Sequence, residues 1–272
     1  MIGPSGVGKS TLHNRLKRVD LSSKSFLTHH EAIVASAKKQ RISIRHPYIF
    51  LLNMVLNTGI YREKAFGMAN RQIRFLHRFG KPLSRHDFEQ YRYSFRLYYK
   101  YLASEVNAFV VHRRISNYIK KIDEHEMYKQ LLPVGVPIII DEGISHYFHT
   151  FFDQIDIRSD IEKIRTDDVF CVDGLISCEQ DPDIVYLQAR DRKNTGVRTF
   201  THGHLSDSEL KKLVYENVDQ QMRKVQFYSD IGIPILRVNT GDDFADNLLR
   251  INIFASKISE KRTPEPVASN QL

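Results

Sequence analysis

A glycine-rich loop that ends in lysine and serine opens the chain, with the residues Gly3-Pro4-Ser5-Gly6-Val7-Gly8-Lys9-Ser10. Glycines allow a backbone to curl until successive N–H groups point at one anion. Residues 10–19 have helical periodicity, with Leu12, Leu16 and Val19 on one face. The positive N-terminal end of that helix would add to the anion site. The segment therefore predicts a phosphate-binding loop between a strand and a helix, which requires an α/β fold.

We call residues 3–10 the P-loop and expect it to bind a nucleoside triphosphate, with ATP and Mg²⁺ as cofactors. Lys9 can reach the β- and γ-phosphates, and the Ser10 hydroxyl can ligate Mg²⁺. A chance occurrence of this pattern is possible but rare. The predicted nucleotide-binding residues in this part of the chain are Gly3, Pro4, Ser5, Gly6, Val7, Gly8, Lys9, Ser10 and Thr11.

Short apolar runs alternate with helical periodicity along the chain. Because parallel strands that are buried on both faces have continuous apolar sequences, we predict strands at four places: 25–28, 137–141, 183–187 and 234–238. Helical periodicity follows at 206–229 and 243–258. Strands that alternate with helices are typical of βα units and a parallel sheet.

The composition is that of a globular protein, with 272 residues, 42% hydrophobic and 26% charged. The sequence contains no run of about eighteen apolar residues, which a membrane helix would need, and no signal-peptide pattern precedes the P-loop. Cys171 and Cys178 are the two cysteines, without a CxxC pair. We therefore expect no disulfide framework or zinc site, and a cytoplasmic location.

The net charge of +8 is concentrated in residues 58–131, which contain fifteen Lys and Arg against seven Asp and Glu. This region belongs to a long helical stretch over about 49–132. A basic surface beside a phosphate-binding loop favours an anionic ligand, whether nucleotide, sugar phosphate or nucleic acid. The alternative is a solvated helix face. An aromatic stripe in this stretch favours core packing over base stacking; its residues are Phe88, Tyr91, Phe95, Tyr98 and Leu102.

Asp141 ends the apolar run 137–141. A parallel sheet binds its ligands at the carboxyl ends of its strands, so Asp141 is expected beside the P-loop as a second Mg²⁺ ligand. Glu142 follows and could polarise a hydroxyl or a water molecule. The alternative for Asp141 is a helix cap without a catalytic role.

In the order and spacing of these motifs, the chain resembles the P-loop kinases of the nucleoside and nucleoside-monophosphate kinase type, including thymidylate and deoxynucleoside kinases. The resemblance is carried by the P-loop, Glu31, Asp141-Glu142-Gly143, an arginine-bearing loop and Asn239-Thr240-Gly241-Asp242. It implies a P-loop NTPase three-layer α/β fold with a parallel sheet in the order 2-3-1-4-5. It also implies a kinase that transfers the γ-phosphoryl group of ATP to a small-molecule acceptor.

The resemblance implies further roles at matching positions. Glu31 corresponds to the acid that acts as a base toward the acceptor hydroxyl. The predicted lid loop 189–204 would bring arginines over the transferring phosphate; they are Arg190, Arg192 and Arg198. The alternative is a basic surface loop. Thr240 and Gly241 lie where such kinases border the adenine.

The chain also departs from the family pattern. These kinases carry an arginine directly after the acid at the end of the third strand, and here Asp141 is followed by Glu142. The helical segment before that strand is long, so we expect an unusual acceptor, whose identity the sequence leaves open. Two histidine pairs, His29-His30 and His202-x-His204, lack a third ligand at metal spacing and favour polar loop residues.

We expect one kinase-like domain over 1–260, with a helical insertion at about 58–132 and a disordered tail at 261–272. Only Met1 and Ile2 precede the P-loop, so strand 1 would be stunted. Such a short strand favours the interpretation that residues are missing upstream of Met1, because a central strand contributes much of the hydrophobic core of a sheet.

Two other classes of function are weighed against a small-molecule kinase. A P-loop ATPase or polynucleotide-end kinase could grip nucleic acid through the basic helical insertion. A GTPase is disfavoured because no Asn-Lys-x-Asp motif follows a predicted strand, and the LSGGQ signature of transporter ATPases is also absent. The sequence leaves the oligomeric state open.

Overall fold

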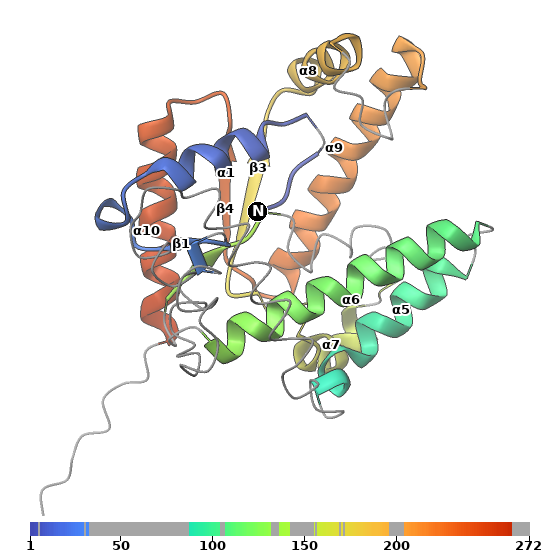
Figure 1. The fold of residues 1–272 in the computed structure, drawn as a ribbon, viewed down its shortest axis with the longest axis vertical. Helices are drawn as coiled ribbons and strands as arrows, with labels where there is room; N and C mark the ends of the chain where they lie inside the picture. Colours follow the sequence, from blue (N-terminus) through green and yellow to red (C-terminus); the bar gives the residue numbers. More distant parts are fainter. Residues whose placement is uncertain are drawn as a thin grey trace, which may run out of the picture.

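The computed structural model describes residues 1–4, 6–29, 31–32, 87–103, 107–131, 136–141, 155, 157–168, 170, 172–195 and 204–262. Within these ranges the chain is mostly helical and has two small parallel sheets of two strands each, a mixed α/β architecture (Figure 1). The strands are β1 (Leu27–Thr28), β2 (Ile138–Ile139), β3 (Leu175–Glu179) and β4 (Ile235–Asn239). The α-helices are α1 (Lys9–Arg18), α5 (Arg92–Leu102), α6 (Ala108–Leu131), α7 (Ile157–Thr166), α8 (Pro182–Asn194), α9 (Asp207–Asp230) and α10 (Phe244–Arg262). Two short 3₁₀ segments are η1 (Leu21–Ser23) and η2 (Asp87–Tyr91).

Residues 1 and 2 lie between the two sheets and hydrogen-bond to both. The Ile2 N–H donates to Ile176 O at 2.9 Å, and the Cys178 N–H donates to Ile2 O at 2.8 Å, which places Ile2 alongside β3. On the other side the Met1 amino group donates to Ile140 O, directly after β2, at 2.5 Å. The spatial succession is therefore β1, β2, residues 1–2, β3 and β4, with both strand pairs parallel.

Most of the predicted elements are confirmed where the structure describes them. The helix expected at 10–19 is α1, and those expected at 206–229 and 243–258 are α9 and α10. The strands expected at 25–28 and 137–141 contain β1 and β2, and the strand expected at 234–238 overlaps β4. The helical reading of 49–132 is confirmed for α5 and α6, and residues 33–86 lie outside the described ranges.

The predicted strand at 183–187 is wrong, because these residues belong to α8. Asp181 is the N-cap and accepts a hydrogen bond from the Asp183 N–H at 2.8 Å, and Pro182 occupies the first turn. Both features favour a helix start, since the cap satisfies a free N–H and proline has none to lose. The strand that precedes this helix is β3, where Leu175, Ile176 and Cys178 are buried.

Two clusters of buried apolar side chains hold these elements together. The first joins α1, the β strands, α8, α9 and α10, and includes Val7, Leu12, Leu16, Phe26, Ile176, Val185, Leu210, Val238 and Ile251. In Figure 1, α9 and α10 lie on opposite sides of the β3–β4 pair, and both contact β4. Burial of an aliphatic side chain stabilises the fold by about 1.5–3 kcal/mol, so this cluster fixes the sheet and the P-loop helix relative to each other.

The second cluster joins the helices α5, α6 and α7 to α9. Tyr91, Tyr98 and Leu102 are buried in it, which confirms the core reading for these members of the aromatic stripe; the Phe88 side chain lies outside the described part. The Tyr91 hydroxyl donates to the buried Glu126 carboxylate at 2.5 Å. Burial and this contact raise the pKa of Tyr91.

None of the helices that the structure describes is both long enough and apolar enough to cross a membrane.

Candidate functional site

The backbone of the P-loop is curled at two of its glycines. Gly6 has φ of 96° and Gly8 has φ of 89°, and both values lie in the left-handed region. Glycine adopts this region without the steric cost that a Cβ atom brings. Between them the Val7 N–H donates to Pro4 O at 3.3 Å and closes a tight turn. The glycine spacing noted in the sequence thus corresponds to a real backbone requirement.

Neighbouring elements surround the loop so closely that Cβ atoms on its glycines would contact them. A Cβ on Gly3 would lie 2.8 Å from Cys178 O in β3, and one on Gly6 would lie 3.2 Å from Val185 O in α8. A Cβ on Gly8 would lie 3.3 Å from Thr240 Cβ, in the turn after β4. The loop therefore lies where β3, α8 and the turn after β4 meet.

Lys9 is the first residue of α1 and folds back over the loop. It is 9% exposed, and its Nζ donates to Gly3 O at 2.8 Å and to Pro4 O at 3.2 Å. These bonds hold the ammonium group against the backbone of the P-loop. A phosphate group bound in the curl of the loop would therefore lie close to this positive charge.

The N-terminal end of α1 adds its free N–H groups to the same place. Gly8 is the N-cap residue and makes no side-chain cap. Because the first N–H groups of a helix have no acceptor within the helix, this end is a ready site for an anion. Ser10 and Thr11 lie in this first turn and are exposed.

Asp141 follows β2 and carries a buried oxygen with no partner. Its Oδ1 atom is shielded from solvent and makes no hydrogen bond among the residues that the structure describes. Asp141 and Lys9 both interact electrostatically with the Met1 amino group and with the Cys178 thiol, so they lie around the same strand ends. A carboxylate oxygen without a partner and the Ser10 hydroxyl are the donor atoms that Mg²⁺ prefers, so these residues fit the ion.

The turn after β4 is joined to the P-loop by a hydrogen bond from Thr240. The Thr240 hydroxyl donates to the Val7 carbonyl oxygen, and it also lies 2.6 Å from the Gln180 side-chain oxygen. The Thr240 N–H donates to Glu179 O at 3.2 Å, and the Gly241 N–H donates to Asn239 Oδ1 at 2.9 Å. The structure thus places the predicted Thr240 directly beside the loop, with Gly241 next to it in the same turn.

The start of the predicted lid loop at residue 189 is wrong, since α8 continues to Asn194. Arg190 and Arg192 are therefore helical residues and are half-buried. The Arg190 guanidinium lies over the Tyr186 ring, 5.6 Å from the ring centroid. Salt bridges join α8 to α9, with Lys193–Asp207 at 2.8 Å and Lys211–Asp183 at 3.0 Å.

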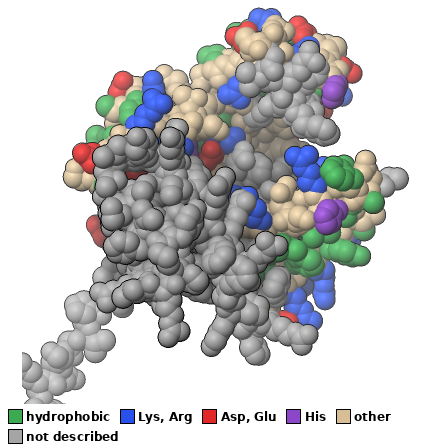
Figure 2. All heavy atoms as spheres, in the orientation of Figure 1, with side chains coloured by type: hydrophobic (Ala, Val, Ile, Leu, Met, Phe, Trp, Pro, Cys, Tyr) green, Lys and Arg blue, Asp and Glu red, His purple; other side chains and the backbone are tan. Residues whose placement is uncertain are grey.

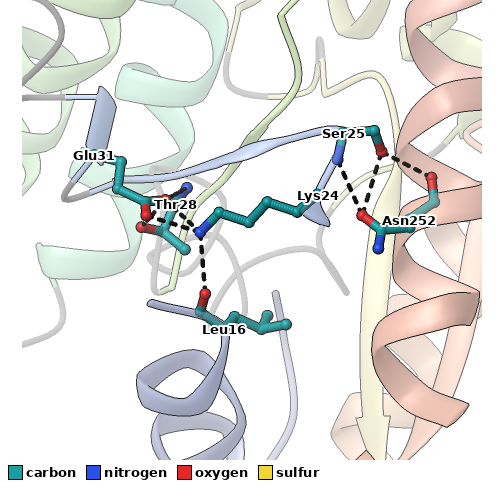
Figure 3. A network of polar contacts seen from close by, with 6 residues as sticks. All are labelled: Leu16, Lys24, Ser25, Thr28, Glu31 and Asn252. Atoms are coloured by element: carbon teal, nitrogen blue, oxygen red, sulfur yellow. Dashed lines mark hydrogen bonds and ion pairs between the residues drawn. The ribbon is translucent and has the colours of Figure 1, made fainter. Parts of the chain in front are cut away.

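Glu31 belongs to a network that anchors the turns around β1 (Figure 3). The Lys24 ammonium, whose side chain is 0% exposed, donates to both Glu31 carboxylate oxygens at 2.8 Å and to Leu16 O at 3.1 Å. The Thr28 N–H and hydroxyl each donate to Glu31 Oε2 at 2.8 Å. Action as a base would require some of these contacts to be exchanged, so the role of Glu31 in catalysis stays a prediction.

Asn252 of α10 completes the network from the opposite side (Figure 3). Its side-chain oxygen accepts from the Ser25 N–H at 3.0 Å, and its backbone oxygen accepts from the Ser25 hydroxyl at 3.0 Å. The C-terminal helix thus fixes the segment that leads into β1.

Several predicted residues lie outside the described part of the chain: Ser5, Glu142, Arg198, His30 and His202. Of the other histidines in these pairs, His29 stacks on His13 at 5.9 Å between ring centroids, and His204 is exposed. Within the described ranges, no group of three His, Cys, Asp or Glu residues could hold a metal ion.

Two residues near the loop were missed by the sequence reasoning. Gln180 lies directly after β3 beside Thr240, and no motif marks it. Lys224 lies in α9 and is 5% exposed. Lys224 lies three residues after Gln221 and four before Tyr228, and both of these are buried, so it is a lysine on the buried face of the helix. This pattern could have been noticed in the sequence.

Comparisons with known proteins gave no match: no family model matches the sequence, and neither a curated protein nor a solved structure does.

Proposed function

We propose that this chain is an ATP-dependent phosphotransferase that binds Mg-ATP at the P-loop and passes the γ-phosphoryl group to a small-molecule acceptor. The observation that carries the proposal is the curled loop itself. Two left-handed glycines lead into an uncapped helix N-terminus, with the Lys9 ammonium held at the same loop. Such an arrangement of N–H groups and a lysine suits the phosphates of a nucleotide.

The strand succession also supports a P-loop NTPase fold. The order β1, β2, residues 1–2, β3, β4 agrees with the expected 2-3-1-4-5, in which strand 1 leads into the P-loop. In such sheets ligands bind beyond the carboxyl ends of the strands. Asp141, Gln180 and Thr240 follow the carboxyl ends of β2, β3 and β4, respectively.

The residues of the site have separate tasks in the proposed reaction. The P-loop N–H groups and Lys9 would hold the phosphates and fix their orientation. Asp141 and Ser10 would hold Mg²⁺, which when bound neutralises charge on the phosphoryl oxygens. Arg190 and Arg192 lie on α8, the helix that packs on Gly6, and could approach the transferring group from that side. The acceptor would be a nucleoside, a nucleotide or a sugar-like molecule.

The test is ADP release from Mg-ATP, measured without acceptor and then with separate pools of nucleosides, nucleotides, sugars and oligonucleotides. The proposal predicts that one small-molecule pool stimulates release and that Lys9→Ala abolishes it. Because Lys9 is buried, Lys9→Met is run beside it as a variant that keeps the apolar stem. Stimulated turnover that survives in a folded Lys9 variant would contradict the proposed role of the P-loop.

A second candidate function rests on the exposed surface of α5 and α6. Basic side chains there are exposed: Arg92, Arg96, Lys100, Arg113 and Lys120. Tyr99 and Phe109 on the same helices are 63% and 70% exposed. Figure 2 shows Lys and Arg side chains beside hydrophobic ones on this part of the surface. Basic and aromatic groups together suit single-stranded nucleic acid.

The oligonucleotide pool separates this candidate from the first. A polynucleotide-end kinase would respond to oligonucleotides, with binding that weakens steeply as salt is raised. ADP release that is indifferent to every pool would instead favour an ATPase whose basic helices grip a macromolecule.

A further inference from the structure

Lys224 is a buried lysine for which the described structure provides no counter-charge. It is 5% exposed, in the middle of α9. Among the described residues, none forms a hydrogen bond or an ion pair with its ammonium group. A buried charge without a partner is costly, so such a group is normally either paired with an anion or shifted toward its neutral form.

The surroundings of Lys224 place it near the P-loop. One turn earlier on α9, the Gln221 amide donates to Ser177 Oγ in β3 at 3.3 Å, and Ser177 is bridged to Ile2. Ile2 leads directly into Gly3. Lys224 and Lys9 repel each other electrostatically, and Lys224 also acts on the Met1 amino group.

The chemistry of this cluster indicates the missing partner. Lys224 and Lys9 are two cationic groups within electrostatic reach of each other, and Lys9 is held at the P-loop by its bonds to Gly3 O and Pro4 O. Burial first, and then repulsion by Lys9, lower the pKa of Lys224 to about 7. An anion near Lys9 would relieve the repulsion and favour the charged form of Lys224.

We propose that Lys224 is a second cation of the phosphate site and contacts the phosphate groups that the P-loop binds. The inference rests on the proposed nucleotide binding and adds a residue that the P-loop pattern does not contain. Lys224 is neutral in part of the empty molecules at neutral pH and takes up a proton when the phosphate groups bind. Binding therefore draws a proton from solution above pH 7.

The test measures binding of Mg-ADP and of inorganic pyrophosphate by calorimetry, for the unchanged chain, Lys224→Met, Lys224→Arg and Lys212→Met. Lys212 is on the same helix with its side chain 78% exposed, so Lys212→Met is the matched control. Lys224→Met should bind both ligands about 10- to 100-fold more weakly, as for the loss of one charge-assisted hydrogen bond. Lys224→Arg should recover part of this loss, and Lys212→Met should match the unchanged chain.

Proton uptake gives a readout that a structural role would not move. Titrations at about pH 8 in two buffers of different ionisation enthalpy report the protons taken up on binding. Among the described titratable groups, Lys9 acts on Lys224, and the Cys178 thiol interacts in turn with Lys9 and Asp141. All of them remain in Lys224→Met, so uptake that disappears in this variant belongs to Lys224.

The outcomes distinguish the two proposals. If Lys224→Met is folded, binds both ligands with unchanged affinity and takes up the same number of protons, the role of Lys224 is overturned and the P-loop proposal stands. If the unchanged chain binds neither ligand, both proposals are overturned. A weaker Lys224→Met with no change in proton uptake would also overturn the direct contact, since a general loss of packing would explain it.

Discussion

The Thr240 hydroxyl donates a hydrogen bond to the Val7 carbonyl oxygen and so joins the turn after β4 to the P-loop. The two residues are 233 positions apart in the sequence. The same hydroxyl lies 2.6 Å from the side-chain oxygen of Gln180, the residue after β3. One small side chain thus touches the ends of two strands and the loop, which makes it a sensitive test of how the loop is held.

Thr240→Val should leave the P-loop less firmly held, although the side-chain volume at position 240 hardly changes. The substitution removes the hydroxyl and leaves the Val7 carbonyl without this donor, so we expect a loss of about 1–2 kcal/mol in the free energy of unfolding. We also expect weaker nucleotide binding, because the loop loses a fixed point. Thr240→Ser keeps the hydroxyl and is the control in urea unfolding. Equal stability of all three chains would show that the bond contributes nothing.

Gly8→Ala should destabilise the fold through both backbone and side-chain effects. The φ of 89° places a Cβ in the left-handed region, and that Cβ would lie 3.3 Å from Thr240. We expect the free energy of unfolding, measured with urea, to fall by about 2 kcal/mol or more.

Gly232→Ala is the matched control for that substitution. Gly232 has φ of 84°, and a Cβ there would meet nothing within 4 Å. In this variant the free energy of unfolding should fall by only about 1 kcal/mol, the cost of a left-handed backbone with a Cβ atom, and the affinity for nucleotide should be unchanged. If the two alanine variants behaved alike in both measurements, the close approach of Thr240 to Gly8 would be without consequence.

Lys24→Met should strongly destabilise the fold because it leaves Glu31 without its cation. The pair is shielded, with the Lys24 side chain 0% and the Glu31 side chain 15% exposed. Removal of one partner of a buried pair typically costs about 3–5 kcal/mol. The exposed pair Arg237–Glu179 supplies the control, and Arg237→Gln should change the free energy of unfolding by less than about 1 kcal/mol.

Glu31→Gln separates the structural role of Glu31 from the catalytic one. A structural role predicts a lower melting temperature, with turnover kept in the molecules that remain folded. A role as general base predicts turnover about 10²-fold lower at temperatures where the variant is fully folded. Melting curves followed by turnover measured well below the transition distinguish the two.

Much of the fold could be predicted because local sequence determines it. The P-loop spacing located α1, and apolar periodicity located α9 and α10. The error at 183–187 arose because Ile184, Val185 and Tyr186 favour strands by residue type. The Asp181-Pro182 start was the stronger signal, since a cap and a proline fix where a helix begins.

The contacts of the site could not be predicted, because they join residues that are distant in the sequence. Nothing near Thr240 indicates that its hydroxyl meets Val7, which is 233 positions away. Lys224 was missed for the same reason: only the packing of α9 on β3 brings it toward Lys9. Tertiary packing, rather than local pattern, decides which of the candidate residues meet.

His29 should make the protein less stable in mild acid. Burial first, and then the charges of His13 and nearby lysines, lower the pKa of His29 from its usual 6.5 to about 3. The unfolded chain therefore binds a proton as the pH falls below 6.5, while the folded chain does not until about pH 3. Stability contributed by neutral His29 is present above pH 6.5 and is lost between pH 6.5 and 3, by up to about 1.4 kcal/mol per pH unit.

Urea unfolding at pH 7 and at about pH 5 measures this loss. His29→Phe keeps a ring that can stack on His13, which lies 5.9 Å away between centroids, and should show a smaller loss. His204→Gln, at an exposed position, should keep the loss of the unchanged chain. An identical pH dependence in all three would assign the acid sensitivity to other groups.

Equilibrium titration with Mg-ATP tests the central claim most directly, using the unchanged chain, Lys9→Met, Ser10→Ala and His204→Gln. We predict saturable binding by the unchanged chain and by His204→Gln. Lys9→Met should bind at least about tenfold more weakly, because a charged partner of the phosphates is lost. Ser10→Ala should lose affinity only when Mg²⁺ is present, because its hydroxyl would bind the ion. Absence of binding by the unchanged chain, or equal affinity in a folded Lys9→Met, would contradict the claim that this loop is a nucleotide site.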